Sequence, residues 1–108
     1  ITSLKHKSIT IENPLATDEF IVWVPKQDIT IRGLYYVVTG STSVSFDIIH
    51  SGATELVGTD LVATSTQQEK TSTWKDNTCA GGAAIKFKAS AISGTPTSIN
   101  VTIYYTVD

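Results

Sequence analysis

Apolar and polar side chains alternate along most of this 108-residue chain, and the alternation is clearest over residues 83–107. A period of two is typical of β-strands with one buried face. We therefore predict a closing hairpin whose turn lies at residues 93–96, where Gly94 permits a positive φ and Pro96 cannot extend a ladder. The positions expected to face the core are Ile85, Phe87, Ala89 and Ala91 in the first strand and Ile99, Val101, Ile103 and Tyr105 in the second.

Similar alternation predicts earlier strands over residues 8–12, 20–24, 28–38 and 44–50, a weak edge strand over 55–63 and an exposed polar strand over 64–73. The phase becomes ambiguous after Gly33, which is the usual sequence pattern of a β-bulge. Val44, Phe46 and Ile48 are expected on the core face of their strand. Seven or eight short strands and no helix longer than one turn predict an all-β fold, an antiparallel β-sandwich or jelly roll.

The length of the chain allows one hydrophobic core and therefore one domain, which we place at residues 8–108 behind an N-terminal arm of residues 1–7. Ser and Thr occupy 28 positions, a composition that favours strands and turns over helices. The net charge of −2 argues against a nucleic-acid partner. No apolar run approaches the ~20 residues of a membrane-spanning helix, so no membrane partner is expected either.

The sequence offers little for catalysis or metal binding. Cys79 is alone, and neither His6 nor His50 lies in a motif with it, so we interpret the cysteine as a small, partly buried apolar residue. By parity, Asp47 and His50 fall on opposite faces of their strand, and His50 is expected at a strand end or on the surface. We therefore expect no enzyme, no cofactor and no metal site.

The residues with the strongest functional potential are basic or aromatic. The cluster Lys5-His6-Lys7 is either part of a solvated terminal arm or part of an arm that contacts an acidic neighbouring subunit. Two segments, residues 20–24 and 34–38, are apolar on both faces, which indicates contact with other subunits. The candidate subunit-interface residues are Phe20, Val22, Trp23, Tyr35 and Tyr36.

Aromatic side chains also allow a second interpretation. Trp23, Trp74 and Tyr104, together with Tyr35 and Tyr36, are candidates for a platform on which a carbohydrate ring stacks. The competing interpretation is that these aromatic residues pack in the core and between subunits. The sequence leaves both open.

The order of segments resembles that of small β-sandwich modules among the structural proteins of tailed bacteriophages. The resemblance covers nearly the whole chain, and four stretches carry it: Glu12-Asn13-Pro14, Asp28-Ile29-Thr30-Ile31, residues 40–50 (GSTSVSFDIIH) and residues 93–105 (SGTPTSINVTIYY). This family includes head decoration proteins, head fibres and tail-fibre segments, and it offers no catalytic residues to transfer to this chain.

The resemblance implies a non-enzymatic virion component, commonly trimeric. We expect a capsid decoration (cement) protein or a head-fibre protein that binds the major capsid protein or other virion proteins, with Lys5, His6 and Lys7 contacting the capsid. Such a protein would reside on the virion and assemble in the cytoplasm of the bacterial host. The alternative that the resemblance leaves open is a carbohydrate- or receptor-binding module of a tail fibre.

Overall fold

The computed structural model describes residues 4–40 and 42–108. Throughout these residues the regular structure consists of β-strands, and no helix long and apolar enough to cross a membrane is found among them. The fold is an antiparallel β-sandwich, as the alternation predicts. The strands are β1 (Lys5–Glu12), β2 (Glu19–Trp23), β3 (Ile29–Thr39), β4 (Ser43–His50), β5 (Thr54–Glu55), β6 (Leu61–Ala63), β7 (Gln68–Lys70), β8 (Thr78–Cys79), β9 (Ile85–Ser93) and β10 (Ser98–Val107).

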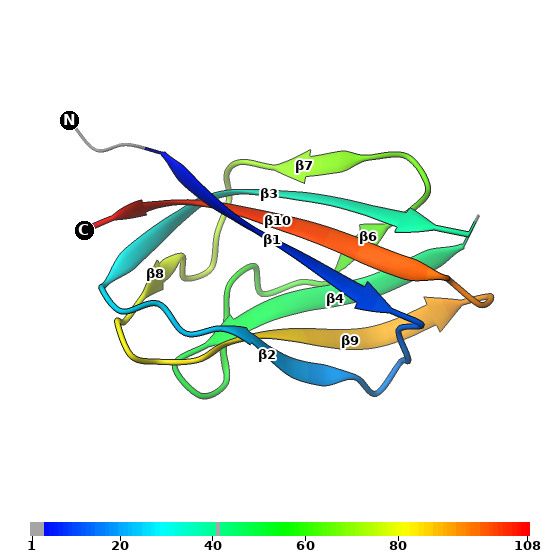
Figure 1. Cartoon of the computed structure of the whole chain (residues 1–108), viewed down its shortest axis with the longest axis horizontal. Helices are drawn as coiled ribbons and strands as arrows, with labels where there is room; N and C mark the ends of the chain where they lie inside the picture. The colour runs from blue at the N-terminus through cyan, green and yellow to red at the C-terminus, as the bar shows by residue number, and fades with distance from the viewer. Residues whose placement is uncertain (1–3, 41) are drawn as a thin grey trace.

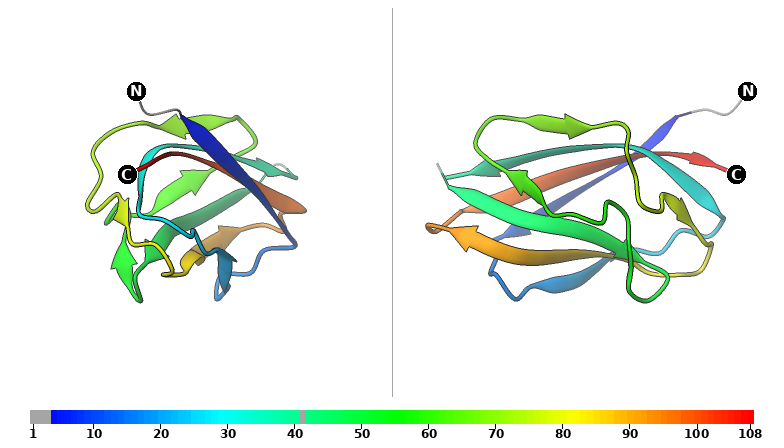
Figure 2. Two further views of the ribbon diagram at one scale, coloured as in Figure 1. Left: turned by 60° about the vertical axis from the view of Figure 1, so that its left-hand side comes forward. Right: turned by 180° about the vertical axis from the view of Figure 1, so that it is seen from behind.

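The strands form two layers that face each other across the core (Figures 1 and 2). Sheet A has the order β1-β10-β3-β7, and β8 pairs with the other end of β3. Sheet B has the order β2-β9-β4-β5, and β6 also pairs with β4. The edge strands β1 and β2 lie on the same side of the sandwich, toward the viewer in Figure 1 and at the back in the right-hand view of Figure 2.

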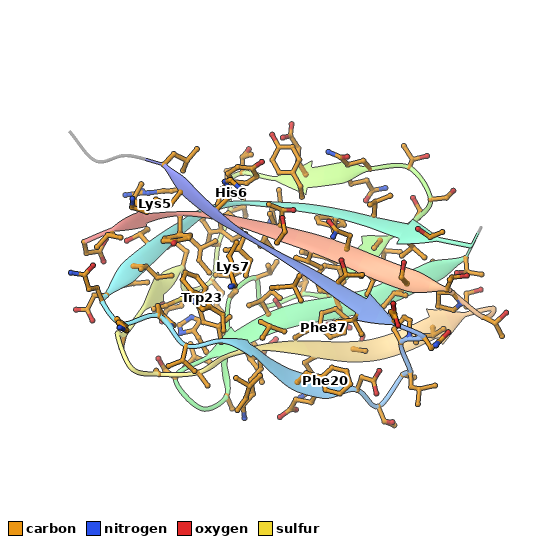
Figure 3. The ribbon with its side chains drawn as sticks, viewed as in Figure 1. Lys5, His6, Lys7, Phe20, Trp23 and Phe87 are labelled. Carbon is orange, nitrogen blue, oxygen red and sulfur yellow. The ribbon has the colours of Figure 1, made fainter. Side chains whose placement is uncertain are left out.

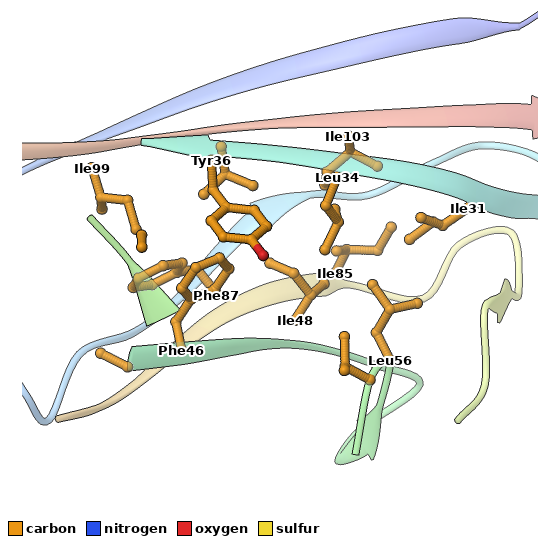
Figure 4. Packing of buried hydrophobic residues seen from close by; sticks show 14 of the residues in the cluster. Ile31, Leu34, Tyr36, Phe46, Ile48, Leu56, Ile85, Phe87, Ile99 and Ile103 are labelled. Atoms are coloured by element: carbon orange, nitrogen blue, oxygen red, sulfur yellow. The ribbon is translucent and has the colours of Figure 1, made fainter. Parts of the chain in front are cut away.

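The core lies between the sheets and is built mainly from the inward faces of their central strands (Figure 4). Its centre is aromatic: Phe46 and Phe87 stack with their ring centroids 5.3 Å apart, and Tyr36 from the opposite sheet meets Phe46 edge-on at 5.5 Å. Aliphatic side chains fill the remaining space. Those without solvent exposure are Ile31, Leu34, Val44, Ile48, Leu56, Ala63, Ile85, Ile99 and Ile103.

The bulge predicted at Gly33 is present beside that residue. Tyr104 of β10 pairs with Gly33 of β3, but Tyr105 pairs with Ile31, so Arg32 is the extra residue on β3. The bulge resets the alternation, and this is why Ile31 and Leu34 are both buried although strict alternation would place residues three positions apart on opposite faces.

The closing hairpin predicted from the alternation is wrong. The strands β9 and β10 are both present, but β9 belongs to sheet B and β10 to sheet A, so the turn at 93–96 connects the two layers. Alternation cannot distinguish these arrangements, because strands paired in one sheet and strands facing each other across a core bury the same face. Ala91 also differs from the prediction: Ser90 is an extra residue in the register of β9 with β4, and beyond it Ile92 turns inward while Ala91 is exposed.

Three predicted strands differ from the sequence-based expectation by more than one residue, and β8 was not predicted. The first strand begins at Lys5 rather than at residue 8. The weak strand expected over 55–63 is divided into β5 and β6, which both pair with β4. The polar stretch 64–73 is a strand only over Gln68–Lys70, which pairs with Leu34 to Tyr36 of β3.

Candidate functional site

Lys5, His6 and Lys7 belong to the sheet and not to a free arm. They pair with Tyr105, Tyr104 and Ile103 of β10, respectively, and all three side chains are exposed (Figure 3). A basic cluster near a chain terminus indicates a solvated arm, whereas backbone pairing with β10 does not require apolar side chains. Residues 1–3 of the predicted arm lie outside the described residues.

The two lysines lie on the core-facing side of the edge strand β1. Their partners Tyr105 and Ile103 are on the inner face of β10, as are the partners of Ile9 and Ile11 further along β1. A lysine that points inward at a sheet edge opposes the addition of another strand, because pairing there would cover its charge. Edge protection is therefore a structural role for Lys5 and Lys7.

The five candidate interface residues do not form one surface. Tyr36 is buried in the core, and Tyr35 lies on the opposite, outer face of sheet A. Val22 and Trp23 are half-buried and pack against the core cluster, and Trp23 also contacts Tyr105 with the ring centroids 4.7 Å apart. Only Phe20, which is 43% exposed, presents a large apolar surface to solvent (Figure 3).

Phe20 is one of four exposed apolar residues along one edge of sheet B, on both faces of β2 and in the flanking loops, which we together call the β2 edge. It consists of Leu15, Phe20, Ile21 and Val24, whose exposed fractions are 62%, 43%, 63% and 49%. In the described part of the chain β2 pairs only with β9, so its other side presents free backbone groups. An apolar edge strand of this kind is a ready site for association with other protein.

A hollow of about 410 Å³ lies beside the β2 edge, where the loop after β1 meets the turn between β9 and β10. Its lining is predominantly apolar and includes Leu15 of the β2 edge. The lining residues are Asn13, Pro14, Leu15, Ala16, Ile92, Gly94, Thr95 and Pro96. The hollow extends the apolar surface from the strand onto the adjoining loops.

The candidate stacking residues Trp23, Trp74 and Tyr104 are not brought together. Trp23 packs against the core, and so does Trp74, whose ring lies 5.6 Å from the ammonium group of Lys70. Tyr104 is on the outer face of sheet A. Its ring centroid lies 5.1 Å from that of Tyr35 on β3 and 5.7 Å from that of His6 on β1.

This aromatic group is the centre of what we call the tyrosine face, on the outer side of sheet A: His6, Gly33, Tyr35, Asn100, Thr102 and Tyr104. The sequence places Asn100, Thr102 and Tyr104 on one face by alternation. The sequence does not indicate that Tyr35 and His6 lie beside Tyr104. Their proximity depends on the pairing of β10 with β3 and with β1, which places residues about 70 and 98 positions apart in the chain next to each other.

Two buried polar residues hold loops against β4. Asp47 accepts backbone N–H groups of Ile48, Val57 and Gly58 at 2.7, 3.3 and 3.2 Å, and its burial raises the pKa of the carboxyl group despite these bonds. His50 is at a strand end, as expected, but it is buried, so a surface position is wrong. Its Nε2 lies 2.8 Å from the carbonyl oxygen of Asp76. Both side chains are thus engaged in structural hydrogen bonds.

Cys79 is also buried, and its surroundings raise the pKa of the thiol to about 12, chiefly through desolvation. At neutral pH the group is the protonated, unreactive thiol. Within the described ranges, no group of three or more His, Cys, Asp or Glu side chains is arranged to hold a metal ion.

No protein-family model matches this chain, and no curated protein matches it in sequence. Solved structures do match its fold. A chain of the cyanophage Pam1 capsid asymmetric unit is similar with a TM-score of 0.54 and 12% identity, over 99% of this chain and 85% of that one. A chain from the disulfide-linked pili of Bacillus endospore appendages is similar with a TM-score of 0.48 and 20% identity, over 100% and 92%. The likeness to the capsid chain shows that the two share a fold.

Proposed function

We propose that this protein is a non-enzymatic structural component of a virion, a capsid decoration (cement) or head-fibre protein that acts as a homotrimer by adhering to other virion proteins. The observation that carries the proposal is the β2 edge. A fold shared with a chain of a phage capsid asymmetric unit supports the proposal, since such assemblies are built by adhesion between protein surfaces.

The β2 edge can adhere to another subunit by burial of apolar side chains and by backbone hydrogen bonds. Each of its four side chains is about half exposed, so covering them contributes on the order of 1 kcal/mol per residue. The free side of β2 can also accept a strand from a neighbouring subunit through backbone hydrogen bonds. By contrast, the other edge strand on this side, β1, carries Lys5 and Lys7 on its inner face, so we assign the subunit or capsid contact to β2.

The experiment that tests this proposal measures molar mass by size-exclusion chromatography with light scattering, and co-sedimentation with purified empty capsids of the source phage. We expect a trimer that binds capsids, and loss of both properties in Ile21→Lys, because the charge would be buried at the contact. The matched control is Val62→Lys, since Val62 is 47% exposed on β6, away from the β2 edge. A wild-type protein that remains monomeric and does not sediment with capsids would overturn the proposal.

A second candidate function, a carbohydrate- or receptor-binding module, is favoured by a different observation, the tyrosine face. This surface is aromatic and rich in neutral polar groups, while the β2 edge is apolar. The two surfaces belong to different sheets and can be altered separately.

A further inference from the structure

The tyrosine face presents aromatic rings on three adjacent strands. His6, Tyr104 and Tyr35 lie on β1, β10 and β3, and neighbouring rings are tilted by 42° and 59°. Tyr35 and Tyr104 are half-buried by this contact, so each ring is supported on one side and retains accessible surface on the other. Supported rings lose little conformational entropy when they bind a ligand.

Gly33 leaves space beside these rings. It is the partner of Tyr104 across the β3–β10 pair, and it has no side chain to cover the tyrosine. A hollow of about 210 Å³ results, and Leu4, Arg32, Gly33, Tyr35, Thr71 and Tyr104 line it. A second hollow of about 110 Å³ lies against the same two tyrosines near Asn100 and Thr102. The tyrosine pair thus borders two hollows along the strand direction.

The polar groups around the tyrosines are hydroxyls and an amide, together with two charged residues of opposite sign, Arg32 in the hollow and Glu69 beside Tyr35. The hydroxyl groups of Ser8 and Thr102 are 2.9 Å apart, and the Asn100 amide donates to Thr10 Oγ1 at 2.9 Å. Nearby, the carboxylate of Glu69 raises the pKa of the Tyr35 phenol group. These groups match a ligand that has many hydroxyl groups and no charge.

The residues of the tyrosine face disfavour nucleic acid and protein as its ligands. A nucleic acid requires several Lys or Arg side chains along its phosphates, whereas the net charge here is −2 and Glu69 stands beside Tyr35. A protein interface of high affinity has an extended apolar centre, whereas the exposed aliphatic side chain that lines the hollow beside Gly33 is Leu4 alone. A sugar ring has a C–H face that packs on an aromatic ring and hydroxyl groups that hydrogen-bond to amides and hydroxyls. Ligands with these two features fit concave sites that are lined by aromatic side chains and a few polar groups.

We infer that the tyrosine face binds an uncharged glycan, with one sugar ring packed on Tyr104 in the hollow beside Gly33 and the chain continuing past Tyr35 toward Asn100. This inference rests on the second candidate function and is independent of adhesion through the β2 edge.

The test is a titration of the ¹⁵N-labelled protein, followed by NMR, with a panel of neutral oligosaccharides: hexamers of β-1,4-glucose, α-1,4-glucose, β-1,4-xylose and N-acetylglucosamine. Heparin serves as the charged probe. We expect at least one neutral hexamer to shift the amide signals of β10 and of β3 around Gly33, and heparin to leave them in place. Tyr104→Ala should weaken the binding at least about tenfold, the loss expected when a stacked ring is removed.

Two further variants make the test specific. Gly33→Val should abolish binding by filling the hollow, and the site has room for a Cβ, whose nearest neighbour would be the carbonyl oxygen of Lys70 at 3.7 Å. Phe20→Ala is the matched control, an exposed aromatic residue on the other sheet, and should bind as the wild type does. The amide spectrum of each variant verifies its fold.

Three outcomes would overturn the inference. Binding by none of the hexamers would overturn the inference and leave only the receptor-binding form of the second candidate function. Binding with shifts confined to another surface, or unchanged in Tyr104→Ala, would retain a carbohydrate-binding function but place it elsewhere. Shifts of these amides with heparin alone would assign the face to an anionic ligand. None of these results depends on whether Ile21→Lys dissociates a trimer, so the two proposals fail separately.

Discussion

Individual buried polar residues stabilise the irregular part of this sandwich. The segment between β5 and β6 has little regular structure, and Asp47 compensates by accepting three backbone N–H groups, two of them from this segment at Val57 and Gly58. Buried backbone donors without a partner are costly, so a carboxylate here replaces the missing strand pairing. Alternation does not predict this role, because the backbone groups that Asp47 binds at Val57 and Gly58 are ten or more positions away and approach it only after the chain has turned.

We expect Asp47→Asn to lower the free energy of unfolding by about 1–3 kcal/mol, because the amide NH₂ would face a backbone donor that the carboxylate now satisfies. Urea unfolding followed by tryptophan fluorescence measures the change. The matched control is Glu12→Gln, the same exchange of carboxylate for amide at an exposed position on β1. Equal stability of the two variants would mean that Asp47 contributes no more than a surface carboxylate.

The pKa of Asp47 adds a pH dependence with a definite sign. Burial raises it above the ordinary value of 3.8, so the folded protein binds this proton more tightly than the unfolded chain does. The associated stability is complete below pH 3.8 and is lost as the pH rises through the higher folded pKa. We expect the free energy of unfolding, measured with urea, to decrease as the pH rises over this acidic range in the wild type. This decrease should be absent in Asp47→Asn. A parallel pH profile in the variant would contradict this assignment.

At the scale of elements, the two edge strands on one side of the sandwich have opposite properties. The inner face of β1 changes from Ile9 and Ile11 to Lys7 and Lys5, whereas β2 after Glu19 consists of the apolar residues Phe20–Trp23. A charge on the inner face protects an edge from pairing with another chain. The contrast supports β2 as the strand that associates with other subunits.

We therefore expect Lys7→Ile to increase self-association, since it extends the apolar inner face of β1 to the sheet margin opposite Ile103. Static light scattering over a concentration series measures the effect. Lys26→Ile is the control, because it introduces the same side chain at an exposed loop position outside the strands. If both variants scatter alike, hydrophobicity and not the β1 edge is responsible.

At the scale of the whole molecule, two loops join the sheets at one end. Gly81 N–H donates to the carboxylate of Asp28 at 2.7 Å, and Gly82 N–H donates to the carbonyl oxygen of Pro25 at 2.7 Å. The loop before β9 thereby binds the loop between β2 and β3. A Cβ at Gly81 would lie 2.8 Å from the backbone carbon of Gln27, so the approach requires glycine.

We expect Gly81→Ala to lower the free energy of unfolding by about 1–3 kcal/mol, because backbone atoms of the neighbouring loop must move. Chemical unfolding followed by circular dichroism measures the loss. Gly33→Ala is the control within the same protein, since its Cβ would make only ordinary contacts at 3.7 Å and beyond. Similar losses in both variants would indicate a general effect of removing glycine and not a close contact between loops.

The sequence by itself determined the class of the fold and much of the core. Alternation is a local property, and it correctly placed Val44, Phe46 and Ile48 inside and located the bulge near Gly33. Only the tertiary structure decided which strands are neighbours. The segments around the turn at 93–96 bury the same face in a hairpin as in a crossing between layers, so the pattern could not exclude the hairpin.

Which residues come together in the candidate sites also depends on which strands pair. Trp23 and Trp74 were candidates because they are aromatic, but packing of the two sheets draws them to the core, and pairing of β1, β10 and β3 gathers His6, Tyr104 and Tyr35 instead. A surface built from several strands is set by register between distant segments. The local sequence fixes which face each side chain takes, and the sheet pairing fixes its neighbours.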